Sequence, residues 1–101
     1  GGGNVDGPSA GIALVTAIAS SLRERPVPQD VAMTGELSLH GKVKPVGGVV
    51  EKIHGAQQAG VKRVFIPTEN APEVEGLFPE VDVIPVATIE DAFQKLWGDF
   101  V

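Results

Sequence analysis

The residues with the clearest chemical potential stand at positions 6–11, where the sequence reads Asp-Gly-Pro-Ser-Ala-Gly. Ser9 immediately precedes an apolar stretch that we expect to form a helix from Gly11 to about Leu22. The first N–H groups of a helix lack intrahelical partners and favour negative charge, so they can stabilise an oxyanion. The hexapeptide therefore predicts a serine nucleophile. Because Ser and Pro also open helices for purely structural reasons, a simple helix cap at Ser9 is the alternative.

A nucleophilic serine needs a general base, and Lys52 is the best-placed candidate. The pattern predicts a helix over about 49–59 with an apolar stripe that includes Val49, Ile53 and Ala56. On a helical wheel Lys52 lies about 40° from Ala56, at the border of that stripe. A lysine that is partly desolvated there can act as a neutral base. The alternative is a border lysine that extends its ammonium group into water.

Neither histidine is placed to replace Lys52. His40 falls at the expected tip of a β-hairpin, and His54 points away from the apolar stripe of its helix. The chain has only these two histidines and no cysteine, so we expect neither a metal site nor a disulfide.

The remaining elements follow from turn residues and hydrophobic runs. A hairpin is expected from the stretch 31–45, with strands at 61–66 and 81–86 and a short helix at 73–77 between them. The last helix should run from Ile89 to about Trp97, with Thr88 as its N-cap and Asp91 as the acidic partner three residues later. Two strands joined through a helix favour parallel pairing, and the fold class is α+β with an α/β-like part.

Length and charge limit the functional classes. The chain has 101 residues, a size typical of one domain, and a net charge of −5 with a pI of about 4.8. A nucleic-acid-binding surface would be basic, and no basic cluster occurs, so no nucleic-acid partner is expected. The longest apolar run is too short to cross a membrane, and no signal peptide is visible. We expect a cytoplasmic protein that holds no cofactor in this chain.

Three blocks of the sequence resemble the signature blocks of the Lon protease proteolytic domain. They are residues 6–11, residues 30–36 (Asp-Val-Ala-Met-Thr-Gly-Glu) and residues 41–52, which end at Lys52. Residues 59–70 are also similar to the family, and the resemblance runs from Asp6 to Trp97 with matching order and spacing.

The resemblance implies three main helices on a small mixed sheet with a β-hairpin. Residues 1–5 would be a glycine-rich leader or truncation edge, and residues 6–101 the C-terminal part of the domain. A LonB- or LonC-like member is one candidate subtype.

The resemblance also implies a Ser–Lys dyad peptidase. Ser9 matches the nucleophile of the family and Lys52 its general base. Thr34 matches the threonine that orients the lysine, although a β-branched residue in a strand needs no such role. Asp6 matches an acidic position that can contact the dyad and hold it inactive. The backbone N–H of Ala10 would contribute to the oxyanion site.

Some parts expected of the family do not occur in this sequence. The helix at 11–22 is apolar on all sides, so we expect upstream strands of the domain to be missing. No GxxxxGK[ST] motif is present, so ATP and Mg²⁺ would act at a separate ATPase module.

The resemblance further implies self-association into a ring, commonly a hexamer, with unfolded or damaged proteins as substrates in protein quality control. The alternative function is a non-catalytic assembly module, as in DNA-repair proteins that resemble the RadA family. A generic α/β domain would require all three blocks to match by accident.

Overall fold

The structure, a computed structural model, describes residues 11–98. The predicted site residues Asp6, Ser9 and Ala10 lie outside the described residues. Along the chain the elements are α1 (Ile12–Arg23), β1 (Val31–Met33), β2 (Glu36–Leu37), β3 (Val43–Lys44), α2 (Val49–Gln58), β4 (Arg63–Pro67), the 3₁₀ turn η1 (Thr68–Asn70), α3 (Ala71–Val74), β5 (Asp82–Val86) and α4 (Ile89–Trp97). The α+β class is confirmed.

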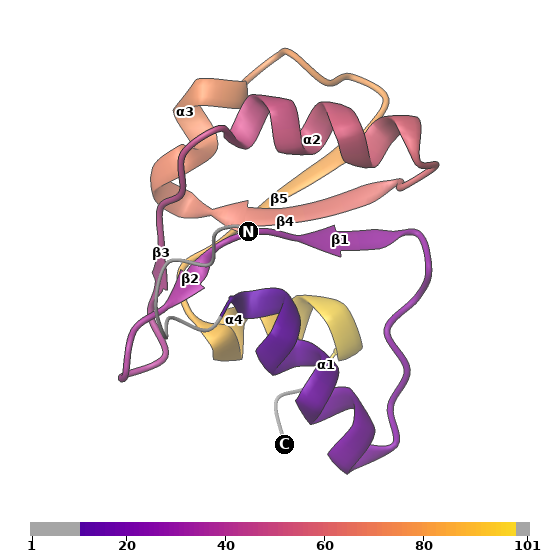
Figure 1. Cartoon of the computed structure of the whole chain (residues 1–101), viewed down its shortest axis with the longest axis vertical. Coiled ribbons are helices and arrows are strands. Elements are labelled where there is room, and N and C mark those ends of the chain that lie inside the picture. The colour runs from indigo at the N-terminus through magenta and orange to yellow at the C-terminus, as the bar shows by residue number, and fades with distance from the viewer. Residues whose placement is uncertain (1–10, 99–101) are drawn as a thin grey trace, which may run out of the picture.

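A three-stranded parallel sheet lies at the centre, in the order β1-β4-β5. Figure 1 shows α2 and α3 on one face of this sheet and α1 and α4 on the other. The parallel pairing of the strands expected at 61–66 and 81–86 is confirmed, with Val64 opposite Val83. The hairpin forms a separate two-stranded antiparallel sheet. The parallel and antiparallel pairs expected in one mixed sheet therefore lie in two sheets.

The hairpin pairs β2 with β3, with Leu37 opposite Val43 and the turn at Ser38–Lys42, as the sequence predicts. The stretch 31–39 was expected to form one arm of the hairpin, and this is wrong. Its first part, β1, pairs with β4 instead. The division occurs at Gly35, whose φ of 142° turns the chain out of the central sheet before β2 begins.

The bounds of α3 differ from the sequence prediction, whereas the start of α4 confirms it. The short helix expected at 73–77 is α3, which covers Ala71–Val74 and therefore begins two residues earlier and ends three residues earlier than expected. Pro72 explains the earlier start, because a proline fits the first turn of a helix, where its missing N–H would have no partner. The Thr88 cap is confirmed: its Oγ1 accepts from the Asp91 N–H at 3.0 Å, and the Asp91 carboxylate accepts from the Ala87 N–H at 3.1 Å.

The core is divided between the two faces of the sheet. Under α2 and α3 it consists of the buried residues Val49, Ile53, Val64, Ile66, Val74 and Val81. Under α1 and α4 it consists of Ile12, Val43, Phe65, Val86 and Ala92. Successive strand residues point to opposite faces, which is why Val64 and Phe65 belong to different clusters.

Helix α1 is buried on one side only, so its apolar composition does not make it a fully buried helix within the described chain. Only Ile12 and Thr16 are buried along it. Leu14, Ile18 and Leu22 are exposed at 58%, 51% and 80%. The described elements cover the face that carries Ile12 and Thr16, and the opposite apolar face has no cover among residues 11–98.

The C-terminal end of α1 is clasped to α4. Arg25 Nη2 donates to the Trp97 carbonyl at 2.9 Å, and Trp97 Nε1 donates to the Pro26 carbonyl at 2.9 Å. The Arg23 guanidinium lies 5.3 Å from the centre of the Phe93 ring, which is 5.0 Å from the Trp97 ring. These contacts fix the end of α1 that is remote from Gly11. No helix within the described range is long and apolar enough to cross a membrane.

Candidate active site

The predicted site lies at the edge of the sheet formed by the carboxyl ends of the parallel strands, not along an outer strand. Figure 1 shows that α1, α2 and α4 all begin at the edge where β1, β4 and β5 end. In open sheets with parallel strands this edge is the usual place for a ligand site, because it collects loops and helix N-termini. Of the five predicted site residues, Thr34 and Lys52 are described, and both belong to segments at this edge.

The start of α1 is anchored to the segment that follows β1. The Ile12 N–H donates to the Gly35 carbonyl at 2.9 Å, and Gly11 forms an isolated bridge with Glu36. Gly11 is the N-cap, so the capping position is not Ser9, which precedes it by two residues in the sequence. The described residue nearest in sequence to the predicted nucleophile is thus held beside the chain that follows Thr34.

Gly35 makes this close approach possible. A Cβ atom at this position would lie 2.8 Å from Val43 Cγ1 and 3.3 Å from Pro67 Cγ. Its φ of 142° is also one that residues with a side chain rarely adopt. The glycine of the second sequence block therefore has a structural function, in which it lets α1, the hairpin and the end of β4 meet.

Thr34 follows β1 directly and is half-buried. Its N–H donates to the Phe65 carbonyl at 3.0 Å, which extends the pairing of β1 with β4 by one residue. The backbone of Thr34 is therefore fixed at the end of the central sheet. It is preceded in the chain by β1 and followed by Gly35, which contacts Ile12.

Lys52 lies in the first turn of α2. Its N–H donates to the carbonyl of Gly48, the N-cap, at 3.0 Å, and its Nζ lies 3.4 Å from the Gly47 carbonyl oxygen. The apolar stripe is confirmed, since Val49 and Ile53 are buried. The expectation that Lys52 is partly desolvated is wrong for the described chain, because the residue is exposed.

The physical reason lies in the neighbouring positions of α2. Ala56 is half-buried and packs against the core under α2, whereas Ala59 is exposed, so Lys52 lies at the border of the buried face and no described element covers it. Small side chains next to a lysine desolvate it only when another element covers them.

Sequence reasoning missed Asn70, which was read only as part of a turn. Asn70 is 1% exposed, and its side chain brackets the backbone of Val46: Oδ1 accepts from the N–H and Nδ2 donates to the carbonyl, both at 3.0 Å. Nδ2 also donates to Glu73 Oε2 at 2.7 Å. The available signal was an asparagine just after a buried strand, where its amide can replace backbone pairing.

The histidines lie where the sequence placed them. His40 is exposed in the hairpin turn, and His54 is exposed on α2. Among residues 11–98 no group of three or more metal-ligating side chains occurs.

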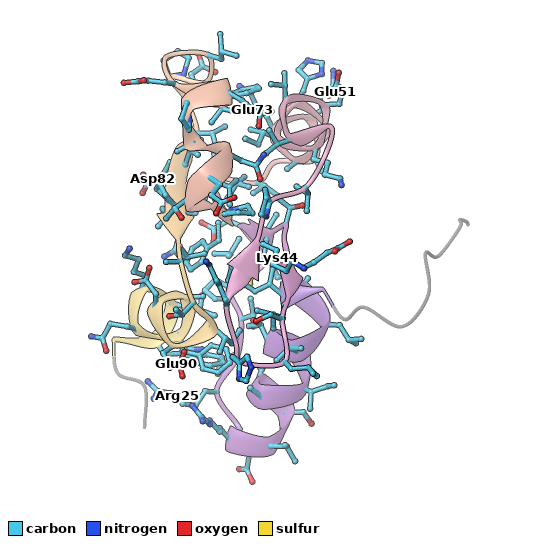
Figure 2. The ribbon with its side chains drawn as sticks, turned by 90° about the vertical axis from the view of Figure 1, so that its left-hand side faces the viewer. Arg25, Lys44, Glu51, Glu73, Asp82 and Glu90 are labelled. Atoms are coloured by element: carbon cyan, nitrogen blue, oxygen red, sulfur yellow. The ribbon has the colours of Figure 1, made fainter. Side chains whose placement is uncertain are left out.

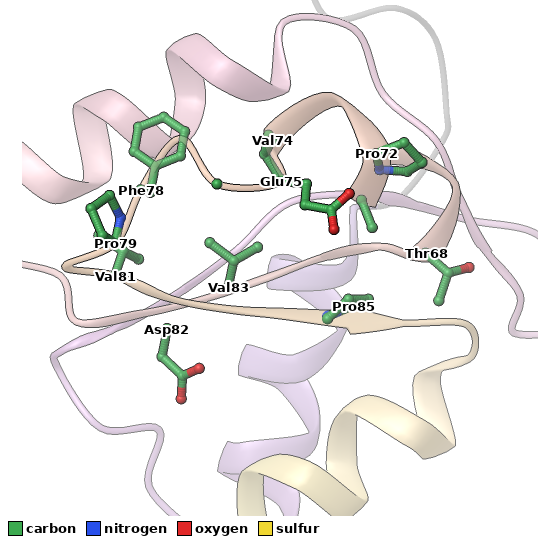
Figure 3. Close-up of a pocket in the computed structure, with 12 residues that line it drawn as sticks. Thr68, Pro72, Val74, Glu75, Phe78, Pro79, Val81, Asp82, Val83 and Pro85 are labelled. Carbon is green, nitrogen blue, oxygen red and sulfur yellow. The ribbon is translucent and has the colours of Figure 1, made fainter.

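A groove of about 690 Å³ lies elsewhere, between α3 and β5 (Figure 3). Thr34 and Lys52 are not among the residues that line it. Glu75 points across the groove in Figure 3, whereas the Asp82 carboxylate points to the other side of the strand from Val83. Apart from these two carboxylates and Thr68 its lining is apolar, with Phe78 and several prolines and valines, and it contains no serine, lysine or histidine.

Strand β5 forms the edge of the sheet beside this groove, and Pro85 blocks its pairing with a further strand. Pro85 has no N–H, and its carbonyl accepts a hydrogen bond from Lys95 Nζ at 3.2 Å. The edge is therefore protected against strand addition at this point.

Comparison with known proteins identifies a family. Residues 1–97 match the model of the Lon protease (S16) C-terminal proteolytic domain. The chain is 55% identical over 76 residues to Lon protease 1 of Thermus thermophilus, which covers 75% of this chain and 10% of that protein. It is 44% identical over 96 residues to Lon protease 2 of Bacillus subtilis, and this match covers 95% of this chain and 17% of that protein.

The mitochondrial Lon protease homolog of Caenorhabditis elegans is 46% identical over 96 residues, covering 91% of this chain and 10% of that protein. The chain thus spans between 10% and 17% of the length of these curated relatives.

Proposed function

Because the chain belongs to the family of the Lon protease (S16) C-terminal proteolytic domain, we propose that it hydrolyses peptide bonds with a Ser–Lys dyad. In this proposal Ser9 is the nucleophile and Lys52 the general base. The observation that carries it is the anchoring of the start of α1 beside Gly35, at the same sheet edge where α2 begins with Lys52 in its first turn.

The proposed reaction uses Lys52 twice. Its neutral Nζ accepts the proton from Ser9 Oγ as that oxygen attacks the carbonyl carbon of the substrate. The ammonium then protonates the amine of the breaking C–N bond, which leaves an acyl-enzyme ester. A water molecule that Lys52 deprotonates hydrolyses the ester and regenerates Ser9.

The supporting residues stay proposals of the same kind. The backbone N–H of Ala10 would stabilise the oxyanion, together with the first turn of α1, whose N-cap Gly11 brings no capping side chain. Thr34, fixed at the end of β1, would orient Lys52 through its hydroxyl group. Asp6 would hold the dyad in an inactive arrangement until substrate arrives.

The wider setting is also proposed. The substrates would be unfolded or damaged proteins, cleaved in a chamber formed by a ring of subunits, commonly a hexamer, in the cytoplasm. ATP and Mg²⁺ would act at a separate ATPase module rather than in this chain. A LonB- or LonC-like subtype stays a prediction.

The alternative is a non-catalytic assembly module of a DNA-repair protein. One observation favours it, because α1 exposes the apolar side chains Leu14, Ile18 and Leu22, which an assembly partner could cover.

The test compares cleavage of an unfolded protein by the full-length wild type, Ser9→Ala and Lys52→Ala. Lys62→Ala is the matched control, because Lys62 is an exposed lysine beside the start of β4, at the opposite edge of the sheet. We expect loss of cleavage in the two dyad variants, wild-type cleavage in the control, and an intact assembly in all. Cleavage that survives in Ser9→Ala would exclude the nucleophile. An inactive wild type with an intact ring would favour the assembly module or an Asp6-locked site.

A further inference from the structure

Asn70 is a buried polar residue whose hydrogen-bonding groups are all used on neighbours. It is 1% exposed, and its amide makes the two 3.0 Å bonds to the Val46 backbone and the 2.7 Å bond to Glu73. A buried amide is costly unless it is satisfied, and a fully satisfied one holds its partners in a single arrangement. The Asn70 amide therefore pairs with both backbone polar groups of Val46, as the backbone of a neighbouring strand would.

Val46 is the last residue before the glycine pair that opens α2. Gly47 and Gly48 are both exposed, and a Cβ at Gly47 would meet no atom within 4 Å other than those of its two chain neighbours. Gly48 has a φ of 68° and is the N-cap. A glycine pair with so little packing leaves the direction of the helix to the residues on either side of it. On the N-terminal side, that residue is Val46, held by Asn70.

The first turn of α2 ties Lys52 to the same segment. The Lys52 N–H donates to the Gly48 carbonyl at 3.0 Å, and its Nζ lies 3.4 Å from the Gly47 carbonyl oxygen. The position of the ammonium group relative to the sheet edge thus depends on where residues 46–48 lie. Asn70 holds Val46 from η1, the turn that follows the central strand β4.

We propose that Asn70 is a positioning residue for Lys52: it holds residues 46–48 so that the base reaches the nucleophile. Glu73 supports it, because the carboxylate accepts one Nδ2 hydrogen while the Val46 carbonyl accepts the other. This orientation leaves Oδ1 facing the Val46 N–H. The proposal rests on the proposed Ser–Lys dyad and adds a residue outside the three sequence blocks that resemble the family's signatures.

The test uses Asn70→Asp in the full-length protein. An aspartate keeps the size and the acceptor for the Val46 N–H, but places an oxygen where Nδ2 donates to the Val46 carbonyl and to Glu73. We expect kcat for an unstructured peptide to fall about 10- to 100-fold while KM stays within about twofold, because a small displacement of a catalytic group has this effect. Reaction of Ser9 with a fluorophosphonate should slow by a similar factor.

The control for a general loss of stability is Trp97→Phe. It removes the hydrogen bond to Pro26 in the clasp between α1 and α4 and keeps an aromatic ring. In Figure 2 the clasp residue Arg25 lies at the opposite end of the molecule from Glu73. We expect Trp97→Phe to leave kcat and the labelling rate unchanged even where its melting temperature falls as far as that of Asn70→Asp.

The decisive comparison repeats the labelling in a Lys52→Ala background. If Asn70 acts through Lys52, Asn70→Asp adds no further slowing there, because the group that it positions is gone. An equal slowing in both backgrounds, or an unchanged kcat in Asn70→Asp alone, would overturn the positioning role. Normal labelling in Lys52→Ala alone would instead overturn the dyad, and this proposal with it.

A milder variant covers the case in which Asn70→Asp does not fold. Glu73→Ala removes only the carboxylate that orients the amide, from an exposed position on α3. We expect a smaller loss of kcat at constant KM and a smaller slowing of Ser9 labelling, and this slowing should be absent in the Lys52→Ala background. An unchanged kcat in Glu73→Ala, if Asn70→Asp cannot be purified folded, would count against the proposal.

Discussion

The two helices that begin at the proposed site differ in how far this chain buries them. Helix α2 has one apolar face, and that face packs on the sheet through Val49 and Ile53 while its remaining side chains meet water. Helix α1 is apolar on all sides, but only Ile12 and Thr16 are buried, and Leu14 and other large side chains stay exposed.

The difference teaches that the two halves of the proposed dyad depend on different parts of the structure. The position of Lys52 is supported within residues 11–98, through Asn70, Val46 and the core under α2. The helix that follows Ser9 is anchored at its start through the Ile12 N–H, but its outer face has no cover among the described residues.

The largest effect should come from the junction between α1 and the sheet. Gly35→Ala combines an unfavourable φ with a Cβ that would lie 2.8 Å from Val43, so we expect a loss of roughly 2–6 kcal/mol in the free energy of unfolding. Urea unfolding followed by the fluorescence of Trp97, the single tryptophan, measures it. Gly55→Ala is the control, because the added Cβ would meet no atom within 4 Å apart from its chain neighbours and the nearby backbone of its own helix, and a gain of about 0.5–1 kcal/mol is expected in mid-helix. Equal behaviour of the two variants would contradict the steric argument.

The next prediction compares the two helices through the same substitution, isoleucine to alanine, made once in each helix. Ile53→Ala removes a fully buried side chain from α2 and should cost roughly 2–5 kcal/mol. Ile18→Ala on α1, at a side chain 51% exposed, should change stability by about 0.5 kcal/mol or less. The same unfolding experiment measures both. Similar losses would show that the outer face of α1 is covered in the folded protein.

A smaller effect tests how the helices begin. Helix α4 is capped by the Thr88 hydroxyl, whereas the N-cap residues of α1 and α2 are Gly11 and Gly48, which have no side chain. Thr88→Ala should cost about 1 kcal/mol, and Thr88→Ser, which keeps the hydroxyl, should recover most of it. Thermal unfolding distinguishes the variants, and an equal loss in Thr88→Ser would point to the lost methyl group instead.

The smallest effect on stability is expected on the outer face of α1. Replacing Leu14, Ile18 and Leu22 by Gln should change the free energy of unfolding by about 0.5 kcal/mol or less per site. Binding of a dye that fluoresces on exposed apolar surface should fall clearly, because the three side chains supply that surface. A large loss of stability with no change in dye binding would contradict the exposure of this face.

Most elements of the fold could be predicted from local sequence. The hydrophobic stripe defined α2, the Thr88–Asp91 pair defined the start of α4, and the glycine at the hairpin tip placed the turn. These features depend on neighbours within a few residues, which the sequence displays directly. The blocks that resemble the Lon family also predicted the family that the comparisons identify.

By itself, then, the sequence determined the helices, the hairpin turn, the family and the candidate residues Ser9, Thr34 and Lys52. Only the tertiary structure decided that β1 leaves the hairpin at Gly35 to join β4, that Lys52 and the outer face of α1 are exposed, and that Asn70 holds Val46. Each of these depends on segments far apart in the chain. Whether a side chain is buried depends on which other segment packs against it. Hydrophobic periodicity shows only which face of a helix or strand would favour such packing.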